Sequence, residues 1–460
     1  MLVSFSVSNF RSFDEEQTFS LVASGRLGSA HETHAIPIPG SSEKVLRAGV
    51  IYGANGAGKS NLVTALQYAK RVALGARVES VGTSRVPFRF REQRDQPSTF
   101  DLQFVAKDNL YRFGFSVNDE RILEEWLIHV VGHKEKPIYE RRTDAEGRVE
   151  IEAPGLKEGS ERLKALVTVG GKHNQSFLAT VRANLEPRDF GDHLNAVINW
   201  LDGGLTLIGP NSRHARLGAE LAIDDKFREF AGNFLKASAT GVDQLKVDRK
   251  ELSKDEVQAL VPEGMLPEIL KGVAQRNRQV LRLSNGRDLM IERTNDGDHF
   301  YQVAIQATHR NEAEKEFVLE LAEESDGTRR LLDLIPTLYS LTQNSAVYVI
   351  DEIDRSMHAM LVYKFLEYFL GVCTRMPCQI IVTTHETHLL DLQLLRRDEI
   401  WFVEKDRRGA THLYSLTDFN VRKDLQIEKG YFEGRFGAVP FLGDIDRLIE
   451  AQPAGSVCHV

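Results

Sequence analysis

Three groups of residues, far apart along the chain, have side chains and spacings suited to phosphate chemistry. The first is GANGAGKS at 53–60, which matches the pattern GxxxxGK[ST]. Gly53, Gly56 and Gly58 tolerate positive φ and close backbone approach, so consecutive N–H groups can point at phosphate oxygens. Lys59 then supplies a positive charge to the β and γ phosphates, and Ser60 supplies a hydroxyl to Mg²⁺. The alternative is a glycine-rich turn that binds nothing.

The second group is an acidic pair that follows the apolar run AVYVI at 346–350. A carboxylate at the C-terminal end of a buried strand can face a phosphate loop and complete a Mg²⁺ shell, a role that suits Asp351. Glu352 can orient and deprotonate a water in line with the γ phosphate. A solvated acidic turn is the alternative, and the phosphate loop in the same chain favours the catalytic interpretation.

The third group is a histidine at the end of another apolar run, Ile380 to Val382. His385 can donate to the γ phosphate and sense its loss. A histidine at a strand end is by itself more often structural or solvated. His388, three residues later, is a weaker competitor for the same role.

A fourth candidate is ESDGTRR at 324–330, which precedes an apolar pattern of helical spacing. Ser325 suits an N-cap, Gly327 lets another backbone approach, and the start of the helix attracts a phosphate. An ordinary capped helix is the alternative. Pro336 predicts a kink in this helix.

The elements that must position these residues follow from periodicity. Residues 1–23 and about 88–142 alternate as strands, an apolar strand at 50–52 precedes the phosphate loop, and an amphipathic helix follows it. Residues from about 157 to 280 favour helices, strands return at about 280–307 around Asn285-Gly286, and 316–420 alternates helix and strand. We therefore expect an α/β fold. It would comprise a P-loop core with an antiparallel β-subdomain (1–156), a mainly helical insertion with a short hairpin (157–315), and the remainder of the core (316–460).

Bulk properties indicate a globular chain without a membrane span. Of 460 residues, 42% are hydrophobic and 27% charged, and the formal net charge is -8. The start, MLVSFSVSNFRSF, lacks the pattern of a signal peptide. Cys373, Cys378 and Cys458 have no metal or disulfide spacing, which fits a cytoplasmic location. The acidic balance disfavours whole-surface binding to DNA. Local basic residues keep a nucleic-acid contact possible, although a solvated strand face is the alternative: Arg85, Arg89, Arg91 and Arg94.

Together these motifs resemble the head of an ABC-type ATPase in the SMC/RecF-like branch. The resemblance is stronger to the AAA-15/AAA-21 group of bacterial anti-phage ATPases (abortive-infection, AbiL-, PARIS- or Septu-like). It rests on NFRSF at 9–13, SDGT at 325–328, DEID at 351–354, THETHLLD at 384–391, RRDEIWFVEK at 396–405 and GRFGAVP at 434–440. It covers about 1–150 and 316–442. The signature lacks the LSGGQ form of transporters, and Met357-His358-Ala359 stands where the family often has Leu-His-Pro.

The resemblance implies an ATPase that uses ATP and Mg²⁺ in a head-to-tail dimer or higher homo-oligomer. Each site would join the residues above with Ser325 and Gly327 of another copy. Further nucleotide contacts would come from Arg11, Asn55, Asn61 and Asp354. It also implies a sensor or regulatory role in anti-phage defence, beside an effector such as a nuclease. A RecF-like DNA-repair ATPase and a scaffold that uses ATP only for assembly are the competing functions. The Q-loop glutamine stays open among Gln93, Gln96 and Gln103.

Overall fold

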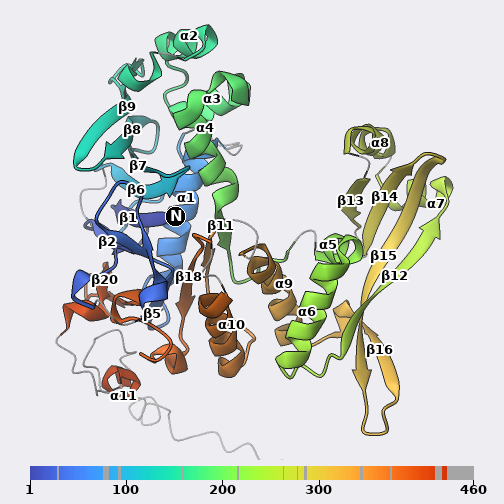
Figure 1. Ribbon diagram of the computed structural model, residues 1–460. Coiled ribbons are helices and arrows are strands. Elements are labelled where there is room, and N and C mark those ends of the chain that lie inside the picture. The colour runs from blue at the N-terminus through green and yellow to red at the C-terminus, as the bar shows by residue number, and fades with distance from the viewer. Residues whose placement is uncertain are drawn as a thin grey trace, which may run out of the picture. The chain divides into compact units, whose positions relative to one another are not determined.

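The computed structural model describes residues 1–432 apart from 28–30, 76–81, 92–94, 158, 215–216, 263, 277, 284–286, 342–344, 373–375 and 420–426. The chain is α/β, as predicted, and divides into two compact units (Figure 1). We call Leu2–Leu201 with Thr383–Val460 the P-loop unit, and Met1 with Asp202–Val382 the signature unit.

An antiparallel sheet of seven strands forms one part of the P-loop unit, in the order β10-β9-β8-β7-β6-β1-β2. Its strands are β1 (Leu2–Ser8), β2 (Gln17–Ser20), β6 (Ser98–Ala106), β7 (Asn109–Val117), β8 (Ile122–Val131), β9 (Lys134–Thr143) and β10 (Val149–Glu152). Lys107 and Asp108, with φ of 45° and 61°, make the two-residue turn from β6 to β7. The predicted β-subdomain is therefore present.

One face of this sheet packs on α1 (Lys59–Leu74), the helix that follows the phosphate loop. The Phe10 ring lies 5.2 Å from the Tyr68 ring of α1 and 5.1 Å from the Phe100 ring of β6, between ring centroids. Phe115 of β7 stacks on Phe100 at 5.0 Å. Because strand side chains alternate between faces, Phe113 and Phe115 of β7 share one face, with their ring centroids 6.0 Å apart.

The phosphate loop follows a short, fully buried strand. β5 (Ala48–Gly53) pairs in parallel with β19 (Ile400–Lys405), which pairs antiparallel with β20 (Thr411–Ser415). All six residues of β5 are buried, as expected for a parallel strand covered on both faces. The remaining elements of the P-loop unit include β3 (Ala35–Pro37), β4 (Lys44–Leu46) and α11 (Ile427–Phe432).

Helix α3 (Phe177–Asn184) closes the C-terminal end of α1. It lies between α2 (Glu161–Val169) and α4 (Gly191–Asn199) along the chain. The Ser176 hydroxyl donates to the Val72 carbonyl at 2.8 Å and caps α3 by accepting from the Ala179 N–H. Arg182 Nη1 donates to the Leu74 carbonyl at 3.1 Å. The last carbonyls of a helix need such partners, so α3 stabilises the far end of the P-loop helix.

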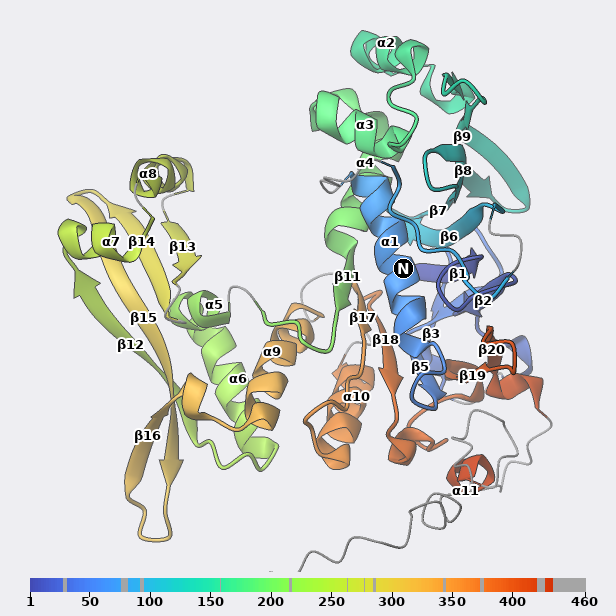
Figure 2. The same cartoon turned by 180° about the vertical axis from the view of Figure 1, so that it is seen from behind.

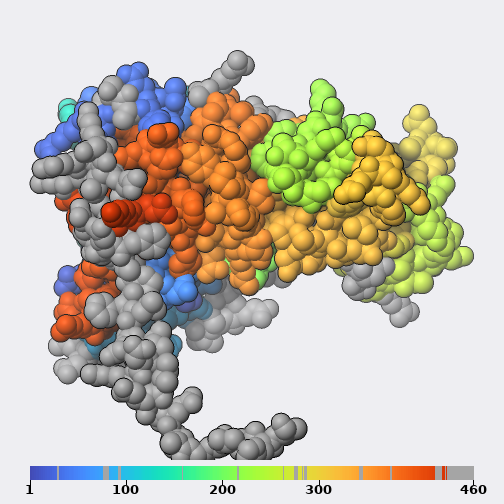
Figure 3. Space-filling view, turned by 90° about the horizontal axis from the view of Figure 1, so that it is seen from below, coloured from blue at the N-terminus to red at the C-terminus, as the bar shows by residue number. Residues whose placement is uncertain are grey.

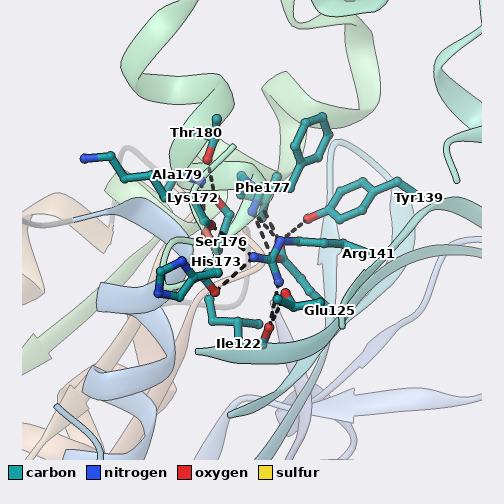
Figure 4. Close-up of polar contacts among 12 residues, drawn as sticks. Ile122, Glu125, Tyr139, Arg141, Lys172, His173, Ser176, Phe177, Ala179 and Thr180 are labelled. Atoms are coloured by element: carbon teal, nitrogen blue, oxygen red, sulfur yellow. Dashed lines mark hydrogen bonds and ion pairs between the residues drawn. The ribbon is translucent and has the colours of Figure 1, made fainter. Parts of the chain in front are cut away.

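A buried charge network ties α3 to strands β8 and β9 (Figure 4). The fully buried Glu125 carboxylate accepts from the Phe177 N–H at 2.9 Å and from the Tyr139 hydroxyl at 2.7 Å. Arg141 donates to the carbonyls of Ile122, Lys172 and His173. Burial raises the pKa of Glu125, while the Arg141 charge opposes that shift; burial also lowers the pKa of Arg141.

The signature unit contains a parallel set of strands that ends at the acidic pair. β11 (Leu205–Ile208) pairs with β17 (Val347–Ile350), which pairs with β18 (Gln379–Thr384). Helices α9 (Asp326–Leu341) and α10 (Ala359–Val372) belong to the same unit, and α9 contains Pro336. Strand β11 lies in the region from about 157 to 280, where the sequence led us to expect helices. A four-residue strand carries too short a pattern to be recognised locally.

A second sheet in the signature unit differs from our expectation of mainly helical residues. Its strands are β12 (Gln244–Leu252), β13 (Arg278–Arg282), β14 (Asp288–Thr294), β15 (Gly297–Arg310) and β16 (Glu316–Glu320). The order is β12-β15-β14-β13, and β16 also pairs with β15 (Figure 2). The charged strand β12 pairs with residues of β15 about fifty positions later, Leu252 with Phe300 for example. Such a distant partner leaves no local signal. Asn285-Gly286 lies outside the described residues.

Four helices accompany this second sheet: α5 (Leu217–Ile223), α6 (Asp225–Ala237), α7 (Lys254–Leu260) and α8 (Met265–Arg276). Val257 of α7 and Ile269 of α8 join Leu289 and Ile291 of β14 in one apolar cluster. α6 packs on α9, and Figure 3 shows its green surface directly beside the gold-to-orange surface of later residues of the same unit. Helix α9, which begins at the signature motif, is therefore held within the signature unit by its packing on α6.

Candidate nucleotide site

The loop between β5 and α1 has the backbone geometry that its glycines predicted. Gly56 and Gly58 have φ of 78° and 120°, which side-chain-bearing residues rarely adopt. A Cβ on Gly53 would collide with the Val403 carbonyl of β19, and one on Gly58 with the Thr411 side chain of β20. The loop is therefore pressed against two neighbouring strands, and glycine is required at both contacts.

Two side chains that were not predicted as site residues, those of Thr411 and Ser12, support this loop. The Thr411 hydroxyl donates to the Ala57 carbonyl at 2.7 Å and lies 2.8 Å from the Ser12 hydroxyl. The Asn61 amide also donates to Ser12, at 2.7 Å. Ser12 belongs to the NFRSF motif, so this motif and β20 hold the loop together. Asn61, predicted to touch nucleotide, donates to Ser12 in this support.

Lys59 is buried, and its amine lies at the centre of the loop. Nζ donates to the Gly53 carbonyl at 2.7 Å and the Ala54 carbonyl at 3.2 Å. It also lies 3.0 Å from His385 Nε2 and 3.3 Å from His385 Nδ1. An ammonium only donates, so a ring nitrogen that takes part in this contact accepts from it. The structure thus brings together two residues that the chain separates by 326 positions.

Three of the loop residues assigned to phosphate and metal contacts are exposed. Asn55, Gly56 and Ser60 are exposed, and Ser60 is the second residue of α1. No atom lies within 4 Å of the position a Cβ would take on Gly56. Open backbone at the start of a helix is the arrangement that binds phosphates.

The NFRSF motif forms a tight turn beside the loop. Phe10 and Phe13 exchange backbone hydrogen bonds of 2.9 and 2.8 Å. Arg11, at the turn, is exposed with φ of 53°, and its N–H donates to the Val86 carbonyl. The buried Asn9 amide donates to the Gln96 carbonyl at 2.6 Å. Asn9 therefore has a structural role, whereas Arg11 presents its guanidinium at the surface.

In the signature unit, the acidic pair follows β17 as predicted. The Asp351 N–H donates to the Ile208 carbonyl at 2.8 Å, and the residue is buried. Glu352 has a left-handed φ of 50°, and its carboxylate lies 3.7 Å from Arg355 Nη1. Backbone strain of this kind is concentrated at functional sites. Asp354 lies in the same turn, two residues before Ser356, whose φ is 60°.

The signature motif lies against this turn within the same unit. Ser325 Oγ accepts from the Thr328 N–H at 3.1 Å, which is the predicted cap of α9. A Cβ on Gly327 would come within 2.7 Å of the Ser356 carbonyl. Ser325 itself is exposed. Two motifs that are separate in sequence are therefore neighbours, and glycine is needed at their contact.

Residues 50–391 match the family model described as "AAA domain, putative AbiEii toxin, Type IV TA system". The chain belongs to this AAA_21 family. It is accordingly a member of a P-loop ATPase family, as the motifs predicted. A search of the curated proteins found no match.

Solved structures similar to this AAA_21 chain include three heads of SMC proteins. They include an SmcHead bound to the C-winged helix domain of ScpA (TM-score 0.41, 14% identity, 90% of this chain and 97% of that one). For the SMC head domain from Thermotoga maritima the TM-score is 0.36 and the sequence identity is 13%, and the match covers 90% of this chain and 98% of that one. For an Smc head bound to the C-terminal domain of ScpA, from Pyrococcus furiosus, the TM-score is 0.34 and the sequence identity is 14%, and the match covers 94% of this chain and 98% of that one. At these TM-scores the likeness carries no argument about function.

The basic residues of the AAA_21 chain that kept nucleic-acid binding open are mostly paired. Arg85 is buried, with an ion pair to Asp119 and a hydrogen bond to the Gln96 carbonyl, so it adds nothing to a basic surface. Arg91 pairs with Asp14 at 2.7 Å. Arg89 is exposed. Arg94, Gln93 and the GRFGAVP segment lie outside the described residues.

The THETHLLD segment contains a second histidine, His388. His388, the competitor of His385, is exposed and paired with Glu386, whose hydrogen bond raises the pKa of His388. It does not contact Lys59 in any hydrogen bond of the described residues.

Within the described ranges, no helix has the length and apolar character needed to cross a membrane.

Proposed function

We propose that this chain binds ATP with Mg²⁺, hydrolyses it to ADP and phosphate, and uses the cycle to regulate an effector in anti-phage defence. The observation that carries the proposal is the contact of Lys59 with His385 inside a glycine loop, in a chain of the AAA_21 family. One residue would bind the terminal phosphate and the other would report its loss. Because the two side chains lie 3.0 Å apart, one bound phosphate would be within reach of both.

The residues present fit a magnesium-bound triphosphate. Mg²⁺ is usually held by a hydroxyl, one carboxylate, water and substrate phosphates, so no dense protein cluster is needed. Ser60 has an exposed hydroxyl at the start of α1, and Asp351 ends a buried strand. Bound Mg²⁺ would neutralise charge on the phosphates. Lys59 and the loop N–H groups would orient the same phosphates, and Glu352 would accept a proton from the attacking water.

A head-to-tail pair of chains would complete each site. Ser325 at the start of α9 is exposed, and the contact of Gly327 with Ser356 places the signature beside the turn that contains Asp354. These residues of one copy would close on the nucleotide of another. ATP would then hold the copies together, and hydrolysis would separate them.

The defence role is supported by the family description, which names a putative AbiEii toxin and a toxin–antitoxin system. The chain would act in the cytoplasm as the sensor or regulator of an effector such as a nuclease. A RecF-like DNA-repair function is the alternative. Burial of Arg85 and pairing of Arg91 weaken the surface that this alternative would use.

Phage challenge of cells that carry the chain together with its neighbouring genes tests this proposal. Lys59→Ala should abolish protection while the protein accumulates normally, because the phosphate charge is lost. Equal protection by the variant would contradict the proposal. A duplex-binding titration at two salt concentrations tests the alternative, and tight, salt-dependent binding by the purified chain would favour repair.

A further inference from the structure

A polar cavity of about 210 Å³ lies within the signature unit, at the junction of three segments. Its walls come from the loop after β11, the first turns of α9 and the turn that follows Glu352. The side chains used below are Ser212, Arg213, Arg330, Asp333, Arg355 and Ser356. A water occupies about 30 Å³ of the liquid, so the cavity has room for a larger polar group.

Arg330 is the most unusual of these residues, because a guanidinium is buried there with few acceptors. The residue is 5% exposed. Its Nη1 makes only two long hydrogen bonds, to the carbonyls of Gly209 at 3.3 Å and Ser212 at 3.4 Å. Nε and Nη2 have no hydrogen-bond partner among the described residues. Buried charged donors without acceptors cost free energy, which an anion would relieve.

The carboxylates at the cavity are already engaged by other arginines. Asp333 accepts from Arg213 at 3.2 Å and from the His214 N–H at 2.9 Å. Asp326, which also lines the cavity, pairs with Arg329. The charges of Asp333 and Asp351 act on Arg330, but among the described residues neither carboxylate makes a hydrogen bond to its Nε or Nη2.

Arg355 adds a second guanidinium at the mouth of the cavity. Its side chain is 46% exposed and lies 3.7 Å from the Glu352 carboxylate, a long and solvated ion pair. Burial lowers the pKa of Arg330, and the charges of Arg355 and Arg213 lower it further, although Asp333 and Asp351 oppose them. The guanidinium stays charged at neutral pH. The cavity is therefore lined by three guanidiniums and two carboxylates, those of Arg213, Arg330, Arg355, Asp326 and Asp333.

We propose that this cavity binds a phosphate-type oxyanion, with Arg330 and Arg355 as its charged ligands. A planar guanidinium matches the oxygens of such an anion in pairs, and the exposed Ser212 and Ser356 also line the cavity. Neither arginine belongs to the nucleotide contacts assigned above, and the site rests on the proposed function only where a second copy supplies the anion. The anion has two possible sources, inorganic phosphate or the terminal phosphate of a nucleotide held by a second copy.

Equilibrium dialysis with radiolabelled inorganic phosphate tests the site in the full-length Lys59→Ala chain. That background removes the P-loop lysine, so binding there reports a second site. We expect saturable phosphate binding, weakened at least about tenfold by Arg330→Gln and by Arg355→Ala, the size of a lost charge-assisted hydrogen bond. Arg355 is half exposed, so its variant keeps the test valid if Arg330→Gln does not fold. Arg293→Ala, which removes an exposed arginine paired with Asp298, should leave binding unchanged.

Absence of phosphate binding in the Lys59→Ala chain would overturn the proposal. So would equal binding by the Arg330→Gln and Arg355→Ala chains. ATP binding by the chain with an intact Lys59 is measured separately, so failure of the proposed ATPase function remains distinguishable. The source is assigned with ATP-dependent dimers of Glu352→Gln. If Arg330→Gln weakens these dimers and phosphate competes with them, a partner's nucleotide supplies the anion; unchanged dimers assign free phosphate.

Discussion

Glu352 stands at a strained position directly after a buried strand, with φ of 50° and its carboxylate partly exposed. If it accepts the proton of the attacking water, Glu352→Gln should bind ATP normally and lower turnover by about 10² to 10⁴, the usual contribution of a general base. Phosphate release and nucleotide binding, measured on the same preparation, check this. Hydrolysis at the wild-type rate would show that another group is the base.

Gly58 is required for a different reason at the same scale. Its φ is 120°, and an added methyl group would collide with Thr411. Gly58→Ala should therefore distort the loop and abolish ATP binding, although the rest of the unit folds. Gly25→Ala is the control, because no atom lies within 4 Å of its Cβ position and its φ is not positive. Fluorescent-nucleotide titration compares the two, and retained affinity in Gly58→Ala would contradict the assigned loop geometry.

At the scale of elements, the P-loop helix α1 is held at its C-terminal end by α3, and α3 is held by the Glu125 network. Arg141→Met should leave the Glu125 carboxylate buried without its cation. Breaking one side of a buried pair typically costs about 3–5 kcal/mol. Arg142→Met on the same strand is the control, because that side chain is 72% exposed and its pair with Glu140 is long. The thermal midpoint should fall by several degrees only in Arg141→Met.

The same network predicts the pH dependence of that loss. Burial raises the pKa of Glu125, and removing the Arg141 charge should raise it further. A carboxyl whose folded pKa lies above its unfolded value stabilises the fold at low pH and loses that contribution as pH rises. The deficit of Arg141→Met should therefore be larger at pH 8 than at pH 5. Denaturation midpoints at both values check this, and an equal deficit would show that Glu125 does not titrate.

At the scale of the whole molecule, the exposed signature should matter only when two copies meet. Ser325→Arg places a long cation at the start of α9 and should block ATP-dependent dimerisation of Glu352→Gln without preventing ATP binding by the single chain. Ser42→Arg, at another exposed serine, is the control. Light scattering after gel filtration with ATP and Mg²⁺ measures the mass. A dimer that persists in Ser325→Arg would exclude the head-to-tail arrangement proposed above.

Much of the site was predictable because its chemistry is local. The phosphate loop needs glycines, a lysine and a hydroxyl within eight consecutive residues, so GANGAGKS indicates it without knowledge of the fold. The cap by Ser325 and the acidic pair after β17 are equally local. Strands β11 and β12 were missed, because their pairing partners lie up to about 140 residues away, whereas the strands at about 280–307 were predicted.

By itself, the sequence determined the phosphate loop, the strand before it, the acidic pair and the family to which the chain belongs. Those features need only neighbouring residues. The tertiary structure alone decided that Thr411 and Ser12 support the loop, that His385 contacts Lys59, and that Gly327 packs on Ser356. The physical reason is that each of these contacts joins segments whose approach depends on strand pairing and core packing across the chain, which no local pattern encodes.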